Sequence, residues 1–172
     1  MVRWAYLLTA FVALAAWAGA QGPAPAAPLS AEDKLRLLKA NSALIDSLVS
    51  DGVAMSGSDT PVKRVEHCRS ASRSLVNAIL EAARGEDAER VAELTGLLRT
   101  VVSEGLVPTL EEAKRGVTPK SPADVKLREV RANAAKDMSD VKAAIPATGK
   151  VGDSPRVKDA LKQLDDLADA LK

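Results

Sequence analysis

The apolar residues of this chain recur every three or four positions, which is the period of a helix that buries one face. Leu44 and Leu48 show this spacing near the start, and Val157 and Leu161 show it near the end. No stretch alternates with the two-residue period of a strand over a useful length. The pattern predicts an all-α fold with helices at residues 31–49, 61–84, 88–115, 122–144 and 155–171.

Residues suited to helix ends mark the same boundaries. A hydroxyl residue followed by proline, which favours a helix start, occurs at Thr60-Pro61, Ser121-Pro122 and Ser154-Pro155. Ser30 and Asp87 can cap the two remaining helices, and Gly85 and Gly116 can end helices. Because most connections are short, we expect successive helices to be antiparallel neighbours in an up-and-down bundle of about five helices. The longest connection, residues 50–60, is expected to be a polar loop.

The third predicted helix contains residues that disfavour a regular helix. Pro108 removes one backbone hydrogen bond and clashes with the carbonyl of Glu104, and Gly105 lies between them. We expect a kink, or a break into two helices, near residues 104–108. Such a feature either bends the helix around the core or acts as a hinge that opens a cleft.

The first 29 residues have the features of a secretion signal and a linker. Arg3 precedes an apolar run from Trp4 to Ala18, and the small residues at 18–20 fit signal peptidase cleavage before Gln21. The Pro/Ala-rich segment 21–29 is expected to be a flexible linker. The predicted division is therefore a signal peptide at 1–20, a linker at 21–29 and a helical bundle domain at 30–172. Such a protein is exported, either to the periplasm or out of the cell, and it meets a membrane only if the signal stays uncleaved.

Composition and charge exclude several kinds of partner. All four aromatic residues, Trp4, Tyr6, Phe11 and Trp17, lie in the predicted signal, so the mature domain would have no ring on which a base could stack. Without Arg3, the 24 basic residues become 23 and equal the 23 acidic ones. A neutral domain has no net field to attract nucleic acid, so we expect no nucleic-acid partner.

The residues that most often support catalysis or metal binding are scarce. His67 and Cys68 are the only histidine and cysteine, and neighbours on a helix point about 100° apart. Zinc needs about four ligands, so we expect no metal and no cofactor. The chain has no Gly-x-Ser-x-Gly elbow and no phosphate-binding loop, so we expect no catalytic residue and no enzyme. His67 is interpreted as an exposed polar residue.

Cys68 lies on the apolar stripe of its helix, between Val65 and Leu75. The position favours a buried thiol in the core. An odd cysteine in an exported protein also allows an intermolecular disulfide.

These observations favour an exported, non-enzymatic interaction or structural module of the cell envelope. Its partner would be another envelope protein or a second copy of the chain. The alternative is a carrier or sensor of a small apolar ligand in the periplasm, with a cavity that the kink near Pro108 opens between aliphatic walls.

Overall fold

The structure is a computed structural model that describes residues 30–146 and 148–171. The expected signal peptide, residues 1–20, and linker, residues 21–29, lie outside these ranges. The chain divides into two compact units, residues 1–39 and 40–172. The described part of the first unit is residues 30–39, which are helical from Ala31 onward.

The described residues contain helices and turns and no strand, which confirms the all-α prediction. The elements are α2 (Ala31–Ser56), α3 (Pro61–Arg84), α4 (Ala88–Thr100), the π-helix η1 (Val101–Leu106), α5 (Val107–Arg115), α6 (Pro122–Ala144), α7 (Gly149–Gly152) and α8 (Pro155–Ala170). Helices α4, η1 and α5 follow one another without a break and together fill the third predicted helix.

The expected polar loop at residues 50–60 is wrong for most of its length, because α2 continues to Ser56. Tertiary packing explains the extension: Leu48 and Met55, on either side of Gly52, both pack against the core. Propensity is a weak prior that such packing overrides. The short helix α7 was also not predicted, and its Val151 is buried in the core.

The predicted helix starts are confirmed at Thr60, Asp87 and Ser121, whose side chains accept hydrogen bonds from the backbone N–H of the third following residue. Ser154 precedes α8 without such a bond, although Pro155 occupies the first turn as expected. At the end of α3 the left-handed position is Glu86, with φ 56°, and Gly85 keeps a negative φ of −79°.

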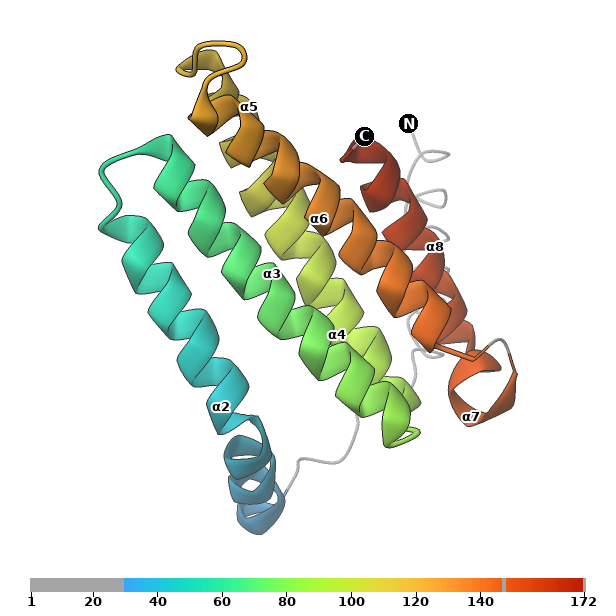
Figure 1. Cartoon of the computed structure of the whole chain (residues 1–172). Helices are drawn as coiled ribbons and strands as arrows, with labels where there is room; N and C mark the ends of the chain where they lie inside the picture. The colour runs from blue at the N-terminus through green and yellow to red at the C-terminus, as the bar shows by residue number, and fades with distance from the viewer. Residues whose placement is uncertain (1–29, 147, 172) are drawn as a thin grey trace, which may run out of the picture. The chain divides into compact units, whose positions relative to one another are not determined.

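Four helical segments of the second unit form a bundle (Figure 1). Helix α3 packs against α4 and α6, and α8 packs against the same two helices, so α4 and α6 occupy diagonal corners. The expectation that successive helices are neighbours is therefore confirmed for α3 with α4 and for α6 with α8. The third predicted helix meets the fourth through its last part, since α5 contacts α6, whereas α4 lies diagonally opposite α6.

The core of the bundle is aliphatic. Leu75, Ile79, Leu98, Met138 and Leu164 are its largest side chains and are at most 1 % exposed. Two buried hydroxyls, those of Ser72 and Thr95, donate to the carbonyls of Cys68 and Val91 on their own helices. These local bonds satisfy the hydroxyls and let small polar residues lie in an apolar core.

The irregularity expected near residues 104–108 is the π-helical segment η1, and the helix continues through it. The N–H of Val107 donates to the carbonyl of Val102, five residues earlier. This wider turn directly precedes Pro108, whose ring would clash with the carbonyl of Glu104 in a regular α-helix. Gly105 faces α3: a Cβ at this position would lie 3.6 Å from the Sγ of Cys68, which is an ordinary van der Waals contact.

Candidate functional site

A groove of 760 Å³ lies at one end of the bundle, between α5 and α6. Helix α8 ends beside the middle of α6, well before the α5–α6 turn, as Figure 1 shows. The groove lies on the side of that end toward the turn, with Leu171 as its lining residue from the end of α8.

The floor of the groove is aliphatic. Leu110 from α5, Leu127 from α6 and Leu171 at the end of α8 line it, and Val117 and Ala135 extend it toward either end. The volume lies within the ~300–1,000 Å³ that is usual for small-molecule sites. The first lining residue along the chain, Leu110, lies two residues after Pro108, and no residue of the π-helical segment lines the groove.

The rim of the groove is charged, with three basic and two acidic residues: Lys114, Arg128, Arg131, Glu111 and Asp124. Both acids face arginines. Asp124 accepts a hydrogen bond from Arg128, and Glu111 lies 3.9 Å from a guanidinium nitrogen of Arg131. Lys114 has no carboxylate within 4.0 Å among the ion pairs of the described residues. The rim therefore has one positive charge in excess.

Arg131 connects the groove to the end of α8. Its Nε donates to the carbonyl of Leu171 at 2.9 Å, and its Nη2 donates to the carbonyl of Ala170 at 3.3 Å. The last carbonyls of a helix lack partners within the helix and attract cations. Arg131 therefore holds the C-terminal end of α8 at the edge of the groove.

The α5–α6 turn forms one wall of the groove. Lys120 has a φ of 65°, and its backbone N–H donates to the Oδ2 of Asp124 at 2.7 Å. The hydrogen bond from Arg128 lowers the pKa of Asp124 most, and the Lys120 N–H and the nearby charge of Lys114 lower it further. These interactions keep the pKa of Asp124 below that of an ordinary aspartate, chiefly through the two hydrogen bonds that its carboxylate accepts.

Cys68 and His67 lie on α3, remote from the groove lining. Cys68 is buried, and its Sγ lies 3.2 Å from the Sδ of Met55 on α2. Burial raises the pKa of the Cys68 thiol, a hydrogen bond with Thr109 offsets part of this rise, and the charge of Asp51 adds to it. A disulfide to a second chain would require α2 to move away from this sulfur.

His67 is half-buried, unlike the exposed residue that was expected. Its Nδ1 lies 3.9 Å from the Oδ1 of Asp51, on α2. This contact could not be predicted from sequence spacing, because the two residues are on different helices. Among the described residues, no group of three or more histidine, cysteine and acidic side chains could hold a metal ion.

Helix α2 carries three exposed large apolar residues at four-residue spacing. Ile45, Val49 and Val53 are 40 %, 59 % and 68 % exposed. Leu44, Leu48 and Met55, which lie on the other side of the same helix, pack against the core. Within the described ranges, no helix is both long and apolar enough to cross a membrane.

Comparisons of the chain with protein-family models, with curated proteins and with solved structures give no match. Function is therefore inferred from the residues and geometry of the chain itself. The sequence assigns no binding role to the rim residues of the groove. Lys114 and Arg131 follow the helical period of ordinary solvated faces, and only the packing of α5, α6 and the end of α8 brings them to one rim.

Proposed function

We propose that this protein binds a small apolar molecule in the groove between α5 and α6 and acts as an exported carrier or sensor. The supporting observation is a 760 Å³ groove with an aliphatic floor. A ligand there would contact α5, α6 and the end of α8 together. Binding without catalysis agrees with the absence of a catalytic constellation in the sequence.

The test uses the complete protein and a neutral fluorescent probe, N-phenylnaphthylamine. Ala132 lines the groove, and Ala143 is an exposed alanine of the same helix outside it. Ala132→Trp fills the groove, so we expect it to weaken probe binding at least tenfold, whereas Ala143→Trp leaves the affinity within about twofold. Equal affinities of both variants for the probe, with unchanged circular dichroism, would contradict the proposal.

Export is a separate part of this proposal. It is supported by the charge, the apolar run and the small residues of segment 1–20. The intact mass of the protein purified from its own host is expected to correspond to a chain that begins at Gln21. A mass that retains residues 1–20 would instead favour a membrane-tethered protein.

A second candidate function is that of an interaction or structural module, and the exposed face of α2 favours it. Ile45, Val49 and Val53 follow one another at four-residue spacing, so an identical α2 in a second copy offers a matching apolar seam. We expect a homodimer whose dissociation constant rises at least tenfold in the Val49→Ser/Val53→Ser variant. Sedimentation velocity tests this, and a monomer at all concentrations would argue against it.

A further inference from the structure

The rim of the groove has three cations and two carboxylates. Of its three cations, Arg128 donates to Asp124, and Arg131 donates to the end of α8 and faces Glu111. Lys114 therefore contributes the unbalanced charge, in the last turn of α5 and at the edge of an aliphatic floor. An ammonium beside an apolar groove suits a ligand that has an aliphatic chain and an anionic head.

We propose that the ligand is a single-chain carboxylate amphiphile, of the fatty-acid class, whose carboxylate pairs with Lys114 while its chain lies over Leu110, Leu127 and Leu171. This inference rests on the proposed function and specifies the ligand of the same groove. A neutral ligand would gain the same apolar contacts but would leave the Lys114 charge unmatched. A cationic ligand would be repelled by it.

Asp124 competes with the ligand for the same cations. Its Oδ2 takes the hydrogen bond of Arg128, and it feels the charge of Lys114. Replacing it by asparagine releases Arg128 for the incoming carboxylate. Asp124→Asn is therefore expected to strengthen binding of the anionic ligand, whereas loss of Lys114 weakens it.

The experiment compares decanoate with decanol and decyltrimethylammonium, each below the concentration at which it forms micelles, by displacement of the neutral probe at neutral pH. We expect decanoate to bind about tenfold more tightly than decanol, and decyltrimethylammonium to bind more weakly than either. We also expect added salt to weaken decanoate binding and to leave decanol binding unchanged, because salt screens exposed charges.

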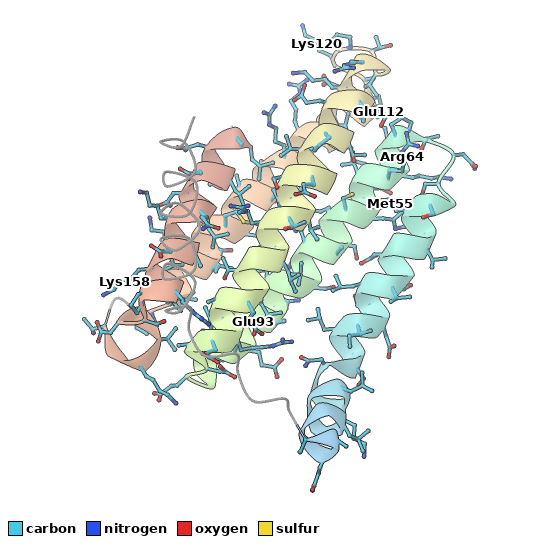
Figure 2. The ribbon with its side chains drawn as sticks, turned by 180° about the vertical axis from the view of Figure 1, so that it is seen from behind. Met55, Arg64, Glu93, Glu112, Lys120 and Lys158 are labelled. Carbon is cyan, nitrogen blue, oxygen red and sulfur yellow. The ribbon has the colours of Figure 1, made fainter. Side chains whose placement is uncertain are left out.

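Three variants test which residues cause the preference for decanoate over decanol. Lys114→Gln is expected to weaken decanoate binding about three- to tenfold and to leave decanol within about twofold, and Asp124→Asn to strengthen decanoate binding about two- to fivefold. Lys158→Gln is the control, since Lys158 is an exposed lysine at the end of the bundle opposite Lys120, as Figure 2 shows. This variant is expected to bind all three ligands as the unmodified protein does. Thermal melting checks that each variant is folded.

The outcomes separate this inference from the proposed function. Equal binding of decanoate and decanol would overturn the carboxylate preference and leave an apolar-ligand protein. Failure of both to displace the probe would count against the proposed function as well. A decanoate preference that persists in Lys114→Gln, or capture of anionic vesicles without binding of free decanoate, would overturn the assignment of the head group.

Discussion

At the scale of single residues, the glycine in the turn after α3 is not the residue that adopts the left-handed backbone conformation. Gly85 has a φ of −79°, and Glu86 has the left-handed φ of 56°. A side chain in the left-handed region costs roughly 1 kcal/mol. The sequence suggests the opposite assignment, because glycine is the residue usually found there.

Glu86→Gly is expected to raise the free energy of unfolding by about 0.5–1 kcal/mol, because it removes the left-handed strain. Gly85→Ala is the matched change. Its Cβ would lie 3.6 Å from the carbonyl oxygens of Ala82 and Glu81, which is ordinary contact, so we expect no loss of stability. Urea unfolding of both variants measures the two effects, and a destabilised Glu86→Gly would show that Glu86 makes a compensating interaction.

Cys68 is the residue for which burial decides reactivity. Its thiol is 4 % exposed, and burial raises its pKa, so both access and thiolate fraction are reduced at neutral pH. We expect Ellman's reagent to react with the folded protein at least 100-fold more slowly than with the protein in urea. Met55→Ala, which uncovers the sulfur from the α2 side, is expected to accelerate the reaction. Equal rates in the folded and unfolded protein would mean that α2 leaves α3 freely.

At the scale of elements, α3 and α6 are joined by a buried ion pair. Asp137 on α6 is 3 % exposed, and its carboxylate contacts Arg69 and accepts a hydrogen bond from Arg73 at 2.7 Å. The side chain of Arg69 is 15 % exposed and that of Arg73 is 58 % exposed. A charge this deeply buried depends on its partner, because water does not compensate for its loss.

Asp137→Asn is therefore expected to destabilise the protein by about 3–5 kcal/mol, since it leaves Arg69 without its countercharge. Arg73→Gln, which removes the exposed partner, is expected to cost less than about 1 kcal/mol. Thermal or urea unfolding distinguishes these values. A similar, small cost for both would indicate that water reaches Asp137 and that packing alone holds α6 on α3.

At the scale of the whole molecule, the groove couples ligand binding to the stability of the bundle. Its walls come from α5 and α6 and from the end of α8, so a bound ligand bridges three elements that the chain connects at distant points. A ligand that binds only the folded state stabilises it by ~2.7 kcal/mol at 100 times its dissociation constant.

Saturating decanoate is thus expected to raise the melting temperature by several degrees, with the increase reduced in Ala132→Trp, whose groove is filled. Differential scanning calorimetry at increasing decanoate concentration measures the effect. A melting temperature that is independent of decanoate would show that the groove stays empty under these conditions.

Much of the fold could be predicted from the sequence because its determinants are local. The helical period, the hydroxyl-proline starts and the absence of strand alternation fixed the fold class and most helix boundaries. The end of α2 was missed because Leu48 and Met55 are held by tertiary packing that no neighbouring residue reveals. The irregularity near Pro108 was expected from the proline itself, whereas its π-helical form, with the Val107 N–H bonded to the Val102 carbonyl, was not.

By itself the sequence determined an all-helical, aliphatic domain with nearly balanced charge, since period, capping and composition depend only on residues close together in the chain. Tertiary structure alone decided the order of the helices, the pairing of Asp137 with Arg69 and the place where α8 ends. The groove also depends on this arrangement of the helices. Its floor and rim consist of residues between 110 and 135 together with Leu171. Packing between helices places these residues side by side, and the spacing of residues along a single helix does not predict it.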